Sequence, residues 1–236
     1  MVFSLTDELV FPDPNLSEDD GLLAVGGDLD PQRLILAYAN GIFPWYNPGD
    51  DIMWWASPFR PVYIPGTVKV SKSMRAAVRK NIFEIKLDHN FDETIRNCAS
   101  VERRGQEMTW ISEEIIDSYQ VLFDIGVLHT VEVYLNDEMV GGLYGVSLGK
   151  AFFGESMFQK VSDASKIALY SLSEMLHKWD YKFIDSQISN PHSFRMGARE
   201  LAKPNFHNLL DDAMSYDTKL GPWEYDFADI LAKLKI

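Results

Sequence analysis

Residues 150–187 constrain the fold of this chain more than any other segment. They contain an apolar run that ends at Glu155, an amphipathic stretch over 163–178 that Asp163 should cap, and a second apolar run over 181–187. This order predicts a strand, a helix and a returning strand. Because such crossovers are almost always right-handed and bring back a parallel strand, the polar residues that end both runs should meet at one sheet edge. Ligands of α/β proteins usually bind outside that edge.

The residues before this unit alternate between apolar and polar, a pattern typical of antiparallel strands. Alternating positions over 129–135, a turn at Asn136-Asp137, and further runs over 138–147 and 150–155 predict three sequential strands. A meander followed by one βαβ crossover is the pattern of an N-acyltransferase-like α/β (α+β) fold. The sequence thus predicts an N-acyltransferase-like C-terminal half.

The first hundred residues have a different character, rich in aromatic residues and mixed in structure. Residues 1–30 look irregular, because Pro and Gly interrupt every period there. Capping signals and periodicity predict helices over 31–40, 71–80, 91–99 and 112–126, and a strand over 83–87. We therefore expect two domains, a mixed N-terminal domain over 1–100 and an acyltransferase-like catalytic domain over 101–236.

Charge and composition limit the partners. The net charge of −13 over 236 residues argues against broad nucleic-acid binding, which depends on Lys and Arg. The charge is uneven, however, and the segment over 69–104 is basic. Lys72, Arg75 and Arg79 share one face of a predicted helix and could bind phosphates. An ordinary solvated helix face is the alternative.

Several classes of protein find no support in the sequence. A single cysteine, Cys98, excludes a disulfide framework and fits a reducing cytosol. The first residues lack the basic and apolar regions of a signal peptide, and no apolar run reaches the ~18 residues of a membrane span. The five histidines show no metal-ligand spacing, and no nucleotide-binding glycine motif occurs. We expect a cytoplasmic monomer without metal, cofactor or membrane partner.

Three polar residues at the predicted sheet edge are candidates for chemistry. Asp185 and Gln187 lie two residues apart on a predicted strand, so their side chains should point to the same face. A carboxylate beside an amide can accept from its NH₂ group and direct its carbonyl oxygen outward. Glu155 ends the neighbouring strand. A solvated strand end is the alternative for the pair, and an anchor for the following helix is the alternative for Glu155.

Aromatic and apolar residues could line a pocket beside these polar groups. Trp45, Trp54, Trp55 and Trp110 could stack on a base or form pocket walls, although core packing is the commoner role for each. Six apolar residues should surround the predicted mouth and could accept an apolar side chain: Leu143, Phe152, Met157, Leu169, Leu172 and Ile184. Plain core is again the alternative.

Nine short motifs in order carry a resemblance to a known family. They are GLLAVGGDL (21–29), GIFPW (41–45), WW (54–55), TWI (109–111), HTVEV (129–133), VGGLYGV (140–146), GESMF (154–158), ASK (164–166) and IDSQ (184–187). Together they resemble the bacterial leucyl/phenylalanyl-tRNA–protein transferases from about Phe11 to about Leu210. Two places depart from the family pattern. The family usually reads S-P-D-P-R after the tryptophan pair, and only Arg60 of this motif is kept here. Pro191-His192 replaces the usual D-H. Leu143 stands where Met is also found.

The resemblance implies a fold and a function and assigns residues to them. It implies a two-part protein whose C-terminal half has an acetyltransferase-like, or GNAT-like, fold, and it makes tRNA the phosphate ligand that Lys72, Arg75 and Arg79 could bind. It implies transfer of Leu, Phe or Met from aminoacyl-tRNA to the α-amine of proteins that begin with Arg or Lys, which marks them for N-degron proteolysis. Matched by position, Asp185 and Gln187 take the catalytic pair and Glu155 the nearby active-site carboxylate. Trp45 and Trp110 take the aromatic walls that hold the 3′ adenosine and the aminoacyl group.

Two other functions would fit the predicted fold. An acyl-CoA-dependent N-acetyltransferase usually carries a glycine-containing pyrophosphate loop between the strand and the crossover helix, and residues 156–162 contain no glycine. A non-catalytic module that binds tRNA or N-degrons would not need Asp185 and Gln187 on one strand face.

Overall fold

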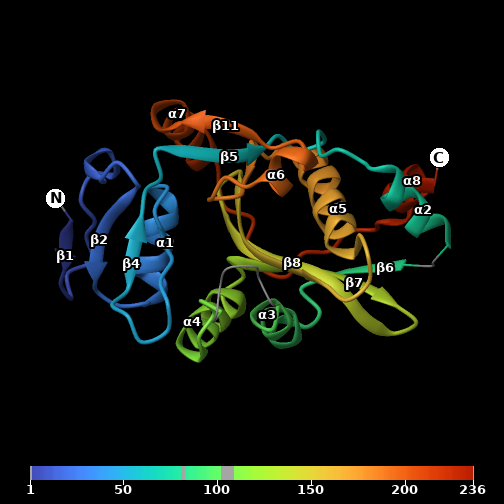
Figure 1. Cartoon of the computed structure of the whole chain (residues 1–236), viewed down its shortest axis with the longest axis horizontal. Helices are drawn as coiled ribbons and strands as arrows, with labels where there is room; N and C mark the ends of the chain where they lie inside the picture. Colours follow the sequence, from blue (N-terminus) through green and yellow to red (C-terminus); the bar gives the residue numbers. More distant parts are fainter. Residues whose placement is uncertain (1, 81–82, 102–108, 236) are drawn as a thin grey trace.

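Two β-sheets organise the computed structural model, which describes residues 2–80, 83–101 and 109–235 (Figure 1). A small sheet has the strand order β1-β2-β4-β3 and a seven-stranded sheet has the order β11-β5-β10-β9-β8-β7-β6. The strands are β1 (Phe3–Leu5), β2 (Leu22–Gly26), β3 (Phe43–Pro44), β4 (Met53–Trp55), β5 (Phe59–Tyr63), β6 (Phe83–Leu87), β7 (Leu128–Leu135), β8 (Glu138–Leu148), β9 (Ala151–Gln159), β10 (Phe183–Asp185) and β11 (Arg199–Ala202). The mixed α/β class predicted from the sequence is confirmed.

The meander and the crossover form the centre of the large sheet. β7, β8 and β9 pair antiparallel, and β10 returns parallel to β9, so that Asp185 lies beside Phe153. The connecting helix is α5 (Ala164–Lys178). Asp163 precedes it in a left-handed conformation, with φ of 68° and no side-chain cap, so the predicted capping role is wrong. Its carboxylate pairs instead with Lys166.

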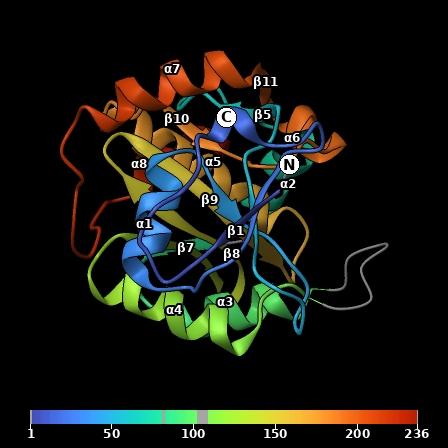
Figure 2. The same cartoon turned by 90° about the vertical axis from the view of Figure 1, so that its left-hand side faces the viewer.

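Helices cover both faces of the large sheet. Figures 1 and 2 show α3 (Phe91–Ala99) and α4 (Glu113–Asp124) on one side of it and α5 on the other. The other helices are α1 (Pro31–Ala39), α2 (Lys72–Lys80), α6 (Pro191–Met196), α7 (Lys203–Met214) and α8 (Ala228–Lys235), with a 3₁₀ turn over Pro14–Leu16. Among the described residues, no helix has the length and apolar character that crossing a membrane requires.

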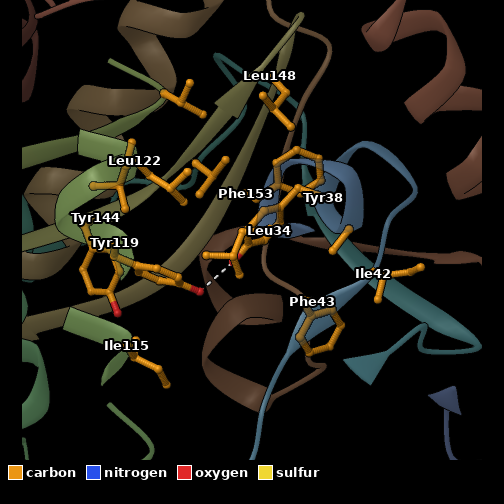
Figure 3. Close-up of a cluster of buried hydrophobic side chains, with 14 of the residues drawn as sticks. Leu34, Tyr38, Ile42, Phe43, Ile115, Tyr119, Leu122, Tyr144, Leu148 and Phe153 are labelled. Carbon is orange, nitrogen blue, oxygen red and sulfur yellow. Dashed lines mark hydrogen bonds between the residues drawn. The ribbon is translucent and has the colours of Figure 1, made fainter. Parts of the chain in front are cut away.

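The core has two parts, one on each side of the large sheet. The first joins α1, α3, α4 and the small sheet, and contains Tyr38, Tyr119 and Phe153 together with the fully buried Cys98 (Figure 3). The second lies under α5, where α2 and α8 also pack. Tyr38 and Tyr119 are buried in the same part of the core as Phe153 of β9. This packing fixes the position of β9 beside the candidate site.

The structure corrects several predicted elements. Residues 1–30 are not irregular throughout, since β1 and β2 lie there, and β4, β5 and β11 were not expected. These strands have three to five residues and depend on partners far along the chain, so they leave no periodic signal. The large sheet takes β5 and β6 from the first hundred residues. A domain division near residue 100 stays a prediction.

Candidate active site

A pocket of about 480 Å³ opens where β9 and β10 separate, beyond the paired residues Phe153 and Asp185. The predicted candidates that line it are Trp45, Trp110, Leu143, Phe152, Glu155, Met157, Leu169, Leu172, Ile184, Asp185 and Gln187. The structure thus brings these eleven candidates together. Further lining residues that the sequence did not indicate include Phe43, Tyr63, Tyr144 and Asn190.

Glu155 enters the pocket from a β-bulge within β9, which continues to Gln159, so the prediction that the strand ends at Glu155 is wrong. Tyr144 of β8 lies opposite Ser156, but the next residue, Gly145, lies opposite Gly154, so Glu155 is the extra residue of β9. A bulge turns the extra side chain away from regular alternation and is often found beside active sites. A Cβ on Gly145 would lie 2.3 Å from the Phe153 carbonyl oxygen, so the bulge requires glycine there. A bulge leaves no signal in the alternation of the sequence.

The Glu155 carboxylate accepts hydrogen bonds from α4 and from the segment that follows β10. Tyr119 Oη donates to its Oε2 at 3.0 Å, and Gln187 Nε2 donates to its Oε1 at 2.5 Å. The Tyr119 hydroxyl is in turn 2.7 Å from the Tyr38 hydroxyl (Figure 3). Burial raises the pKa of Glu155 to about 7, although the donors of Tyr38, Tyr119 and Gln187 oppose the shift. Glu155 therefore changes protonation near neutral pH, and it does not anchor the following helix.

Asp185 and Gln187 are connected differently from the sequence prediction. β10 ends at Asp185, and Gln187 has a φ of 58°, so the two residues do not share one strand face. Asp185 Oδ1 accepts from the backbone N–H of Gln187 at 2.8 Å, while the Gln187 amide donates to Glu155. The predicted bond between their side chains is wrong, because an arginine already holds the Asp185 carboxylate.

That arginine is Arg60 on β5, the antiparallel neighbour of β10. Its guanidinium makes a bidentate contact with Asp185, with Nε 3.2 Å from Oδ1, and also donates to the Gly41 carbonyl oxygen. It lies between the rings of Phe43 and Phe206, at 4.9 and 4.4 Å from their centroids. Arg60 is 1% exposed and Asp185 is fully buried. The sequence signal that could have indicated this ion pair is an arginine within the otherwise apolar segment Phe59–Tyr63.

The four candidate tryptophans divide into two pairs. Trp45 and Trp110 line the pocket, whereas Trp54 and Trp55 lie in β4 of the small sheet and do not line it. Trp55 Nε1 donates to the Trp45 carbonyl oxygen at 2.7 Å and so supports the pocket wall from behind. The apolar lining residues Leu143, Phe152, Leu169, Leu172 and Ile184 are also buried core. These five residues therefore both pack in the core and line the pocket.

The basic face of α2 lies outside this pocket. Met74 and Val78 are buried as the periodicity predicts, while Lys72 and Arg79 are exposed and Arg75 is partly exposed. Arg79 Nε donates to the Lys235 carbonyl oxygen at 2.9 Å, where α2 packs on α8. Phosphate binding by this face stays a prediction.

Comparison with known proteins identifies the family. Residues 62–211 match the sequence model described as leucyl/phenylalanyl-tRNA protein transferase, and residues 27–58 match the model of its N-terminal domain. The chain belongs to the leucyl/phenylalanyl-tRNA–protein transferase family. The resemblance seen in the nine motifs is confirmed, and both matched segments contribute lining residues to the pocket.

Curated relatives match nearly the whole chain. Leucyl/phenylalanyl-tRNA–protein transferases from Thermodesulfovibrio yellowstonii and Nitrosomonas europaea are 47% and 44% identical to it, covering 95% and 96% of this chain and 92% and 97% of theirs. The one from Legionella pneumophila is 42% identical, with 93% and 98% covered. Among solved structures, an aminoglycoside acetyltransferase from a soil metagenomic sample matches with a TM-score of 0.35 and 11% identity over 61% of this chain and 95% of that chain, which is too distant to carry an argument.

The pocket of this transferase has one polar end and one apolar wall. Glu155, Asp185 and Gln187 form the polar end, where a carboxylate with a pKa of about 7 meets an amide. The rest is largely aromatic and aliphatic, and suits an apolar group held next to a reacting polar one. Such a site can position two substrates and exchange a proton close to neutral pH.

Proposed function

We propose that this protein transfers Leu, Phe or Met from aminoacyl-tRNA to the α-amine of proteins that begin with Arg or Lys, which marks them for N-degron proteolysis. It is an aminoacyltransferase of the leucyl/phenylalanyl-tRNA–protein transferase family, at about 45% identity to curated members over most of the chain. The choice of amino acid and of N-terminus is our proposal, as are a monomeric state and a cytoplasmic location. The observation that carries it is the polar end of an otherwise apolar pocket.

The reaction needs positioning more than activation. The donor is an ester of the terminal ribose, and the acceptor is an amine with a pKa of ~7.7–8.0, so a useful fraction is neutral at pH 7. The amine nitrogen forms a bond to the ester carbonyl carbon, the carbon–oxygen bond to the ribose breaks, and one proton moves from the amine to the ribose oxygen. Correct placement of two such groups can lower the barrier by ~7–11 kcal/mol.

Gln187 is the proposed acceptor of a hydrogen bond from the attacking amine. Asp185 holds the backbone of Gln187, and Glu155 accepts from its amide nitrogen. The carbonyl oxygen of that amide is therefore the group left to face a substrate. An amide is too weak a base to keep a proton, so we assign the transient proton to Glu155, whose pKa of about 7 suits uptake and release.

The pocket lining supports the proposed specificity. An apolar wall accepts Leu, Phe or Met but distinguishes one methylene by only ~1–3 kcal/mol. Asp185 is buried and paired with Arg60, so it supplies little free negative charge. Glu155 is then the lining carboxylate, within the described residues, that can attract a cationic N-terminal residue.

The test uses labelled Leu-tRNA and three peptides that differ only in a first residue of Lys, Arg or Ala, without ATP or CoA. We expect label on the Lys and Arg peptides and none on the Ala peptide. Transfer to all three would refute the proposed acceptor specificity, and no transfer from Leu-, Phe- or Met-tRNA would refute the donor. A parallel reaction with acetyl-CoA tests the N-acetyltransferase alternative, and tRNA binding without turnover would favour the binding module.

A further inference from the structure

A second pocket, of about 400 Å³, lies beside the first and is strongly basic. Its lining residues are Lys69, Val70, Ser71, Lys166, His192, Arg195 and Met196. Three of these side chains are cationic and none is a carboxylate. In a chain with a net charge of −13, such a concentration of positive charge in one hollow points to an anionic ligand.

Two elements connect this basic pocket to the first one. Lys166 and Leu169 lie three residues apart on α5, and Leu169 lines the first pocket. Residues with this spacing are neighbours on a helix surface, about 5–6 Å apart. Asn190 also lines the first pocket and caps α6, on which His192 and Arg195 lie. The walls of the two pockets therefore lie about one helical turn apart on α5 and meet again at the start of α6.

The cations of the basic pocket are available to a ligand. Within the described ranges, 2–80, 83–101 and 109–235, the side chains of Lys69 and Arg195 have no hydrogen-bond or ion-pair partner. Lys166 pairs with Asp163, which orients it and leaves two of its three N–H donors. Burial, followed by the charges of Lys166 and Arg195, lowers the pKa of His192.

A helix end adds to the positive potential. Ser71 Oγ accepts from the backbone N–H of Met74 at 3.1 Å, so α2 begins at the wall of the basic pocket. The N-terminus of a helix carries a partial positive charge that favours anions. This contribution comes on top of the three cationic side chains.

We propose that the basic pocket binds a backbone phosphate of the aminoacyl-tRNA, in the nucleotides that precede the terminal aminoacylated nucleoside. The inference rests on the proposed function and on the roles that the family resemblance implies for Trp45 and Trp110, which line the first pocket and would hold that nucleoside and its amino acid. The single-stranded chain leading away from the nucleoside carries one phosphate per nucleotide, and Arg and Lys are its natural partners. An acceptor protein that begins with Arg or Lys would be repelled by the same pocket.

The experiment compares two donors that differ in their phosphates. One is Leu-tRNA and the other is adenosine esterified with leucine, which fills the first pocket but carries no phosphate. The variant combines Lys69→Gln with Arg195→Gln. A matched control combines Lys219→Gln with Lys233→Gln, which removes the same charge at two exposed positions that line neither pocket.

The variant should raise the KM for Leu-tRNA by about 10-fold or more, because it removes two of the three cationic side chains that would contact the phosphate. The dependence of log KM on log salt should become shallower by ~0.7 for each phosphate that the variant no longer binds. The kcat/KM for leucyl-adenosine, the KM for the peptide and the behaviour of the control should not change.

An equal loss with both donors, no loss with either, or a raised KM for the peptide instead would overturn the assignment. A variant with an unchanged melting temperature excludes misfolding as the cause. Failure of the unmodified protein to use either donor would refute the proposed function itself, so the two failures are distinguishable.

Discussion

Replacing Arg60 by methionine should destabilise the protein by about 3–5 kcal/mol, because it leaves a buried carboxylate without its cation. Asp185 is fully buried and Arg60 is 1% exposed, so water cannot replace the guanidinium. Methionine keeps part of the packing between the two aromatic rings, and the loss reports mainly on the charge. The expected loss is within the ~5–15 kcal/mol of an ordinary domain, so the variant should still fold.

The measurement is urea unfolding of the parent, Arg60→Met, Asp185→Asn and the double variant. The double-mutant cycle should give a coupling energy of about 2–3 kcal/mol, because removing both charges relieves the penalty of leaving one. Arg33→Met is the matched control: Arg33 is also 1% exposed, but its partner Asp28 is 48% exposed and can be rehydrated. Arg33→Met should therefore lose less free energy of unfolding than Arg60→Met, and it should keep the transfer rate of the parent protein.

The same Arg60 variant should be slow at the chemical step. Asp185 holds the backbone N–H of Gln187, so loosening Asp185 should displace the Gln187 amide and lower kcat by about 100-fold with little change in the KM for Leu-tRNA. A stability loss under about 1 kcal/mol, or a coupling energy near zero, would refute the reasoning about the ion pair. Stability loss with full kcat would refute its connection to Gln187.

Further variants test the remaining parts of the site. Gln187→Ala should lower kcat by roughly 10²–10⁴-fold while tRNA affinity is kept, and near-full turnover would remove Gln187 from the chemistry. The folded protein holds the Glu155 proton more tightly than the unfolded chain does, so the free energy of unfolding should fall by on the order of 3 kcal/mol as pH rises from about 4.5 to about 7. Glu155→Gln should remove this part of the pH dependence when urea unfolding is measured from pH 5 to 8. If the free energies of the variant and the parent change in parallel with pH, the reasoning is wrong. Leu143→Ala, which enlarges the apolar wall, should shift the ratio of kcat/KM for Phe-tRNA over Leu-tRNA by about 10-fold towards Phe, and an unchanged ratio would place the selecting wall elsewhere. Gly145→Ala should destabilise by at least ~1–3 kcal/mol in thermal unfolding, because its Cβ would meet the Phe153 carbonyl oxygen, and a neutral effect would mean that the bulge can relax.

The sequence by itself determined the features that depend on near neighbours. Asp30 and Ser112 accept hydrogen bonds from backbone N–H groups two and three residues later, as the capping signals predicted, and both helices begin there. The strands predicted over 129–135 and 138–147 are β7 and β8, and the amphipathic run after Asp163 is α5. Short motifs in order were enough to predict the family, because each motif is local.

Only the tertiary structure decided how the polar residues of the site work together. Arg60 and Asp185 are 125 residues apart in the chain and meet because β5 pairs with β10. The bulge at Glu155, its contact with Tyr119 and its raised pKa depend on a strand and a helix packed around it. The direction of a buried carboxylate and the strength with which it holds a proton are set by the groups that replace water around it. Those groups come from every part of the chain, and no local pattern of residues records which of them will be neighbours.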